Sequence, residues 1–152
     1  PIHSSAASDV YKRQVLGGHG DTMVPISRLA TVGGVPVTDL IKPERLKEIE
    51  DRTRVAGGEI VKLFGNGSAF YAPAQSAIEM AESYIKDKKR VIPCASLCEG
   101  EFGIDGYFIG VPTVIGSNGV EQILEFSLTN EESKQLNNTL DAVKKTVSDT
   151  NL

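Results

Sequence analysis

The sequence predicts an α+β domain in which helices pack against an antiparallel sheet. Two long segments with apolar residues at helical spacing are followed by three segments rich in β-branched residues. An Asn-Gly pair separates the last two of these segments, which is typical of a tight hairpin. The chain has 152 residues, of which 40% are hydrophobic and 24% charged. These values fit one globular domain of ordinary size.

Strand-forming residues dominate residues 15–37. The apolar pair Val15-Leu16 runs into a histidine, His19, that has glycine on both sides. Residues 23–37 are rich in Val, Ile and Thr, which predicts one or two strands broken at Gly33-Gly34.

Two helices are expected next. Pro43 suits a first helical position, and apolar residues recur at helical spacing through residue 64. Because Gly57-Gly58 interrupts this pattern, the segment is one helix or a broken pair. The second helix runs to about Asp87, with Ser68 as the expected cap.

The last third of the chain predicts the sheet and a closing helix. Strands are expected over residues 90–97, 107–116 and 120–126. Thr129, followed three residues later by Glu132, fits a capping box. An amphipathic helix then follows.

Charge and composition exclude several classes of protein. A net charge of −4 argues against a nucleic-acid surface, and no apolar run reaches membrane-spanning length. No secretory signal is visible. Cys94 and Cys98 are interpreted as buried free thiols in a reducing cytoplasm. No metal site is predicted, because His3 and His19 are the only imidazoles available as ligands.

The most informative stretch is residues 15–25, which surrounds His19. Flanking glycines allow positive φ angles and a close approach to a ligand. Histidine changes charge near neutral pH and is the usual proton acceptor in enzymes. A lone loop histidine would more simply serve a local hydrogen bond, but the residues around His19 favour catalysis.

The residues around His19 resemble the catalytic histidine loop of the lactate and malate dehydrogenase family. The resemblance continues to the C-terminus and is strongest with the type of malate enzyme that is similar in sequence to lactate enzymes. Its ordered segments are Gly18–Thr22, Gly33–Val37, Gly65–Ala74, Lys88–Cys94 and Gly110–Val120. The resemblance implies the C-terminal, substrate-binding domain of this family.

This resemblance also implies the chemistry. His19 would accept the proton of the substrate hydroxyl while a hydride passes to NAD. The aspartate that orients the histidine, the arginine that grips the substrate carboxylate and the mobile specificity loop are expected upstream of Val15. Asp21 is interpreted as a loop-shaping residue. The G-x-G-x-x-G fingerprint of a dinucleotide-binding domain is absent from the sequence, so NAD would bind mainly to an upstream domain.

Three further residues match family positions beside the substrate and the nicotinamide. Ser68 and Ala69 are expected to bind substrate, and Pro73 to contact the cofactor. Ala69 and Pro73 depart from the residues usual in lactate enzymes, which favours malate. We therefore expect a fragment of a cytoplasmic, homo-oligomeric enzyme that interconverts malate and oxaloacetate in the tricarboxylic acid cycle.

Three alternatives remain open. The first is a fragment of an L-lactate dehydrogenase. The second is a non-catalytic α+β module that binds an anion through residues 17–22. The third is a glycosidase that borrows NAD, although such an enzyme would usually add metal-ligand residues that this sequence lacks.

The first residues do not fit this pattern. Ser4–Gln14 agrees at every residue with the translation of a transposase adapter used in sequencing libraries. We expect residues 1–14 to be a non-native leader and residues 15–152 to be the domain.

Overall fold

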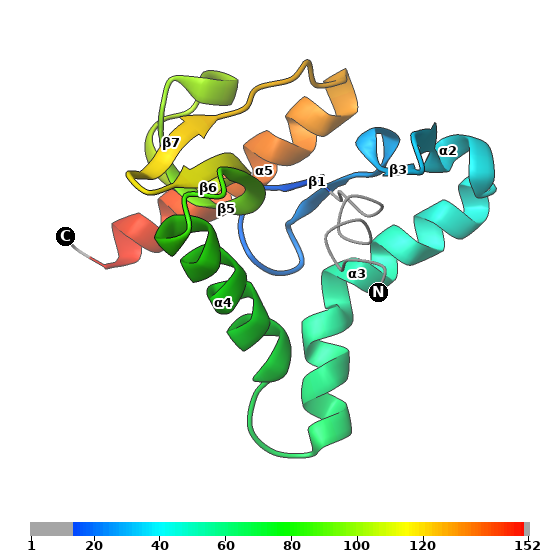
Figure 1. The fold of residues 1–152 in the computed structure, drawn as a ribbon. Helices are drawn as coiled ribbons and strands as arrows, with labels where there is room; N and C mark the ends of the chain where they lie inside the picture. Colours follow the sequence, from blue (N-terminus) through cyan, green and yellow to red (C-terminus); the bar gives the residue numbers. More distant parts are fainter. Residues whose placement is uncertain (1–13, 151–152) are drawn as a thin grey trace, which may run out of the picture.

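The computed structural model describes residues 14–150, which form three small antiparallel sheets and three long helices (Figure 1). In chain order the elements are β1 (Gln14–Leu16), β2 (Val24–Ile26), the 3-10 turn η1 (Ser27–Leu29), β3 (Thr31–Val32), β4 (Val35–Pro36), α2 (Val37–Leu40), α3 (Pro43–Phe64), α4 (Tyr71–Ile85), β5 (Arg90–Glu99), the 3-10 turn η2 (Glu101–Gly103), β6 (Asp105–Gly116), β7 (Gly119–Ile123) and α5 (Asn130–Asp149). The predicted α+β class is confirmed.

The largest sheet has three strands, with β6 in the centre between β5 and β7. Both pairs are antiparallel, and β5 pairs with β6 from Arg90 opposite Ile115 to Glu99 opposite Asp105. The predicted hairpin joins β6 to β7, where Gly119 has a φ of +88°. The three predicted strands are therefore confirmed, although β7 ends at Ile123, short of the predicted residue 126.

The core lies where β1, β2 and β6 meet helix α5. Figure 1 shows α5 crossing one face of the sheet. The predicted capping box of α5 is confirmed: Thr129 and Glu132 exchange hydrogen bonds between side chain and backbone. The buried cluster consists of Leu16, Val24, Ile26, Cys98, Ile104, Ile109, Val111, Leu136 and Leu140.

Helices α3 and α4 form a V that projects from this core (Figure 1). Helix α3 begins at Pro43, as predicted, and runs without interruption through Gly57-Gly58. A Cβ placed on either glycine would meet nothing within 4 Å, so this part of α3 has an open face. Gly65, with a φ of +77°, ends the helix.

The expected cap of α4 was wrong. The N-cap residue is Phe70, no side chain caps the helix, and Ser68 lies in the preceding loop. Pro73 occupies the third helical position, where its missing N–H needs no partner. Ser68 is therefore free to face the pocket described below.

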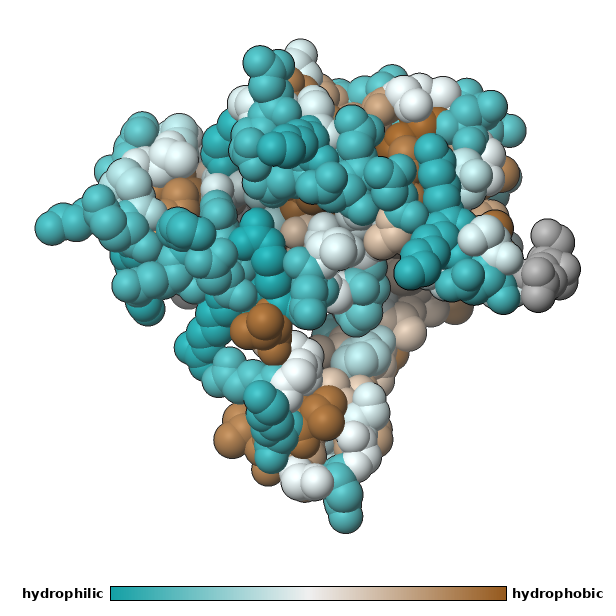
Figure 2. All heavy atoms as spheres, turned by 180° about the vertical axis from the view of Figure 1, so that it is seen from behind, coloured by the Kyte–Doolittle hydropathy of each residue, from teal (hydrophilic) through white to brown (hydrophobic). Residues whose placement is uncertain are grey.

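The V of α3 and α4 exposes large apolar side chains. Leu63 is 81% exposed, and Ile85 is 77% exposed. The rings of Phe64 and Phe70 pack together across the loop at 5.8 Å between centroids. Figure 2 shows hydrophobic residues gathered at the tip of the V, which is unusual for a surface that faces only water. Among the described helices, none combines the length and the apolar character that a membrane span requires.

Both cysteines lie on β5 and neither forms a disulfide, as predicted. Only Cys98 is buried; Cys94 is half-buried, so the expectation that both are buried was wrong for Cys94. Burial raises the pKa of the Cys98 thiol to about 11, and the carboxylates of Glu101 and Glu125 add to this rise. Cys98 therefore acts as a small apolar core residue.

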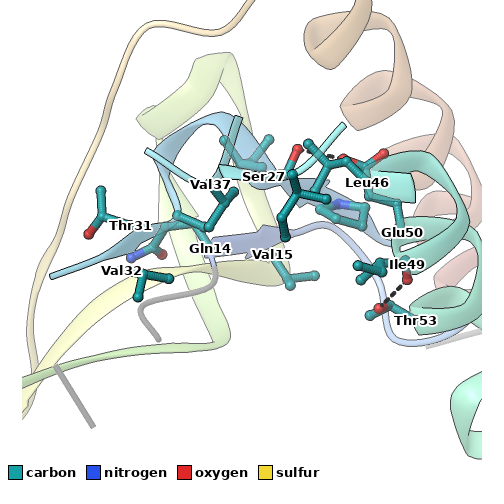
Figure 3. A pocket seen from close by; sticks show the side chains of 14 residues that line it. Gln14, Val15, Ser27, Thr31, Val32, Val37, Leu46, Ile49, Glu50 and Thr53 are labelled. Atoms are coloured by element: carbon teal, nitrogen blue, oxygen red, sulfur yellow. Dashed lines mark hydrogen bonds between the residues drawn. The ribbon is translucent and has the colours of Figure 1, made fainter. Parts of the chain in front are cut away.

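An apolar cavity of about 210 Å³ lies beneath β1 and β2, against α2 and the first half of α3. Figure 3 shows the side chain of Gln14 beside Val32 and Val37 in this cavity. The Oε1 atom of Gln14 is buried and has no hydrogen-bond partner among the described residues. Such an atom loses its bonds to water without compensation, which is costly.

We predict that Gln14→Leu stabilises the chain by about 1–2 kcal/mol, because it removes an unpaired polar atom and fills apolar space. Urea denaturation of both proteins measures the change. Gln14→Glu is the matched control, since it keeps the shape but adds a charge, and it is expected to destabilise. A Gln14→Leu protein no more stable than the parent would contradict the prediction.

Candidate functional site

His19 lies at the tip of a loop between β1 and β2, as the sequence predicts. Gly17 and Gly20 on either side of it have φ angles of +97° and +118°, which L side chains rarely adopt. The N–H of Met23 donates to the carbonyl of Gly20 at 3.0 Å and closes the turn. The glycines therefore shape a turn that leaves the side chain of His19 exposed.

The base of this loop is fixed to the sheet. Gly17 and Gly110 of β6 exchange two backbone hydrogen bonds, each 2.9 Å long. A Cβ on Gly110 would lie 2.5 Å from the carbonyl oxygen of Gly17. The end of β1 can therefore contact β6 this closely only because residue 110 is glycine. The Gly17–Gly110 bridge thus sets where the loop leaves the core.

Helix α5 holds the other side of the loop. Gly18 donates its N–H to Oγ1 of the buried Thr139 at 2.8 Å. The Thr22 hydroxyl lies 3.0 Å from the same Thr139 atom. Nothing in the sequence analysis singled out Thr139, although its hydroxyl lies on the buried face of α5 that carries Leu136 and Leu140.

A second contact ties α5 to the segment after β2. Arg28 of η1 makes a two-point ion pair with Glu132, with N–O distances of 2.8 and 3.0 Å. Burial acts to raise the pKa of the Glu132 carboxyl, but hydrogen bonds from Arg28 and from the backbone of Thr129 outweigh it and lower that pKa. The carboxylate that caps α5 therefore also binds η1.

His19 opens onto a cavity of about 700 Å³ between its loop, the second half of α3 and the start of α4. Ser68, Ala69 and Pro73 line the same cavity. The four residues expected to form the site are thus close together, although almost fifty residues separate His19 from Ser68 in the sequence. The complete lining is His19, Gly20, Asp21, Met23, Arg54, Val55, Gly57, Gly58, Glu59, Val61, Lys62, Ser68, Ala69 and Pro73.

Arg54 is a lining residue that the sequence analysis missed. Its Nε donates to the carbonyl of Met23 at 3.3 Å, and its Nη1 pairs with Asp51 at 2.9 Å. The contact with Met23 joins α3 to the end of the histidine loop. The signal in the sequence was weak, because Arg54 lies in a run of charged residues that resembles a solvated helix face.

Within residues 14–150, no hydrogen bond joins His19 to Asp21, and the side chain of Asp21 is exposed. This arrangement gives Asp21 no orienting contact with the imidazole. The same part of the chain contains no group of three His, Cys, Asp or Glu residues placed to hold a metal ion.

We predict that Gly110→Ala destabilises the chain by about 1–3 kcal/mol, because the added methyl group meets backbone that cannot move aside. Gly57→Ala is the matched control: it adds the same methyl group in open space within a helix and is expected to stabilise by roughly 0.5–1 kcal/mol. Urea denaturation reports both changes. Equal effects of the two substitutions would show that the Gly17–Gly110 bridge is not tightly packed.

Comparison with known proteins identifies the family to which the chain belongs. Residues 3–151 match the family described as lactate/malate dehydrogenase, alpha/beta C-terminal domain. The chain is 58% identical over 134 residues to malate dehydrogenase of Rhodopirellula baltica, covering 88% of this chain and 42% of that protein. It is 57% identical over 138 residues to malate dehydrogenase 1 of Anaeromyxobacter dehalogenans, covering 91% and 44%. The chain thus spans less than half the length of these relatives.

Solved structures of malate and lactate dehydrogenases also resemble this chain. Malate dehydrogenase from Salinibacter ruber superimposes with a TM-score of 0.91 at 48% identity, covering 94% of this chain and 47% of that one. Lactate dehydrogenase from Eimeria maxima, solved with NADH and oxamate, superimposes with a TM-score of 0.89 at 41% identity, covering 93% and 44%. On this evidence the chain belongs to the lactate/malate dehydrogenase family, of which it contains the C-terminal domain.

Proposed function

We propose that the chain is the substrate-binding part of an NAD-dependent malate dehydrogenase that interconverts malate and oxaloacetate. The observation that carries the proposal is the cavity in which His19 meets Ser68, Ala69 and Pro73. The loop that holds His19 is fixed by hydrogen bonds to β6 and to α5, as a proton-transfer group requires.

In this mechanism an unprotonated ring nitrogen of His19 accepts the proton of the malate hydroxyl. Ala69 and Pro73 would hold the nicotinamide end of NAD, which would supply the acceptor for the hydride from the carbon that carries that hydroxyl. Ser68 and Ala69 contact the substrate, and Ser68 supplies a hydroxyl for hydrogen bonding. In the reverse direction protonated His19 returns its proton to the carbonyl oxygen of oxaloacetate.

The residues present fit only the nicotinamide end of the cofactor. Ala69 and Pro73 form an apolar part of the cavity wall, which suits a flat ring better than phosphates. The sequence lacks the glycine fingerprint that binds a dinucleotide pyrophosphate. We therefore assign the rest of NAD binding to a nucleotide-binding domain outside this chain.

Malate is favoured over lactate by two observations. Ala69 and Pro73 depart from the residues usual in lactate enzymes, and both line the cavity. The relatives that are 55–58% identical are named malate dehydrogenases. Lactate dehydrogenase activity is the second candidate, because lactate dehydrogenases from Eimeria maxima and Cryptosporidium parvum share the fold at 41–46% identity.

We further propose a homo-oligomeric, cytoplasmic enzyme. The exposed apolar residues of the V and the open face at Gly57-Gly58 support close packing against another protein surface. Residues 1–14 are proposed to be a non-native leader. The unpaired Oε1 of Gln14 in an apolar cavity supports a different native residue there, whereas residues 1–13 lie outside the described part of the chain.

A chimera tests the proposal. Residues 15–152 are joined to the preceding half of the Rhodopirellula baltica malate dehydrogenase, which is 58% identical in the region compared. We expect the chimera to oxidise malate with NAD and to prefer malate to lactate, while the 152-residue chain alone gives no saturable NADH binding by fluorescence titration. A folded chimera without malate activity, or one that prefers lactate, would contradict the proposal.

His19→Asn in this chimera tests the assigned role. Asparagine keeps a hydrogen-bonding edge but cannot accept the proton, so we expect kcat for malate oxidation to fall by about 10²–10⁴ with NADH binding nearly unchanged. Near-normal turnover in the variant would make His19 a structural residue only.

A further inference from the structure

Thr139 contacts the histidine loop on both sides of His19. Its Oγ1 accepts the Gly18 N–H at 2.8 Å and lies 3.0 Å from the Thr22 hydroxyl. Its methyl group packs against Gly17 so closely that a Cβ on Gly17 would lie 2.6 Å from it. One fully buried side chain on α5 therefore holds the residues before and after the imidazole.

We propose that Thr139 is a positioning residue that sets the placement of His19 through this three-residue contact, here called the Thr139 clamp (Thr139 with Gly18 and Thr22). This inference rests on the proposed function, because positioning matters only if His19 transfers a proton. Small misplacements of a reacting group cost large factors in rate. The clamp fixes the loop within one residue of His19, whereas the Gly17–Gly110 bridge fixes only its base.

Both parts of the threonine side chain serve the clamp. The hydroxyl accepts from Gly18 and has a hydrogen left to share with Thr22, which only a hydroxyl can provide in this position. The methyl group fills the space beside Gly17. Valine keeps the shape and loses the hydroxyl, whereas serine keeps the hydroxyl and loses the methyl group. The two substitutions therefore separate hydrogen bonding from packing.

The alternative is that Thr139 only docks α5 onto the core. Arg28 and Glu132 already join α5 to η1, and Leu136 and Leu140 bury apolar surface beside Thr139. A residue that only docks the helix would stabilise the whole domain and would not act on the loop selectively. The hydrogen exchange of single amides distinguishes the two roles, because exchange reports local opening separately from global unfolding.

The first experiment uses the 152-residue chain and measures amide exchange by NMR in the parent, Thr139→Val and Thr139→Ser. In Thr139→Val we expect the protection of the Gly18 amide to fall at least tenfold while that of the Gly110 amide, in the Gly17–Gly110 bridge, stays unchanged. Thr139→Ser should keep most of the Gly18 protection. Thr146→Val is the matched control, because among residues 14–150 the Thr146 hydroxyl bonds only to the carbonyl of Ala142 in its own helix.

Unchanged Gly18 protection in Thr139→Val would overturn the proposal. So would a parallel loss at Gly18 and Gly110, because that result assigns Thr139 to the stability of the whole domain. Thr22→Val tests the clamp from the loop side, where the residue is exposed. A Gly18 amide and His19 ring signals identical to those of the parent in that variant would also contradict the clamp.

The second experiment measures turnover in the chimera described above. We expect Thr139→Val to lower kcat by about 10–100-fold with the KM for NAD within twofold, and Thr139→Ser to recover most of kcat. Equal kcat in Thr139→Val and the parent would overturn the positioning role. If the parent chimera has no activity while the exchange results hold, the proposed function fails and the clamp remains as a loop contact, so the two failures are distinguishable.

Discussion

The contact between Gly17 and Gly110 is the constraint on which the arrangement of the site depends. Two backbone hydrogen bonds and the lack of side chains bring the end of β1 directly onto the central strand β6. From that point the chain has only Gly18 before it presents His19. Because β6 is hydrogen-bonded on both edges, it is the most constrained strand of the sheet. The loop that carries the imidazole is therefore anchored to the central strand of the sheet.

The opposite side of the cavity is built differently. Helices α3 and α4 leave the core as a V, and they carry exposed apolar residues such as Leu63 and Ile85. Gly57-Gly58 gives α3 a bare face beside the cavity. The wall formed by the histidine loop is thus fixed within the chain. The exposed apolar residues of α3 and α4 support the proposed packing against another protein surface.

The sequence predicted the features that depend on neighbouring residues. The capping box at Thr129, the hairpin before Gly119 and the start of α3 at Pro43 follow from local backbone chemistry. Ser68 was expected both to cap α4 and to bind substrate, because capping and pocket-lining serines look alike in sequence; the structure contradicts only the cap. Thr139 and Arg54 were not found, because their roles come from contacts with distant residues; Gly18 and Thr139 are 121 positions apart.

The charges around the cavity limit what these residues recognise on their own. Arg54 and Lys62 bring two positive charges, and Asp21 and Glu59 bring two negative ones. Arg54 is engaged by Asp51 and by the carbonyl of Met23, which ties it to the protein. Malate carries two carboxylates, so its binding requires positive charge beyond this balanced set. In the proposed function the described residues supply the proton-transfer group and the apolar wall. We therefore propose that the positive groups that bind the substrate carboxylates belong to a surface that closes over the cavity. Those groups would also determine the choice between malate and lactate.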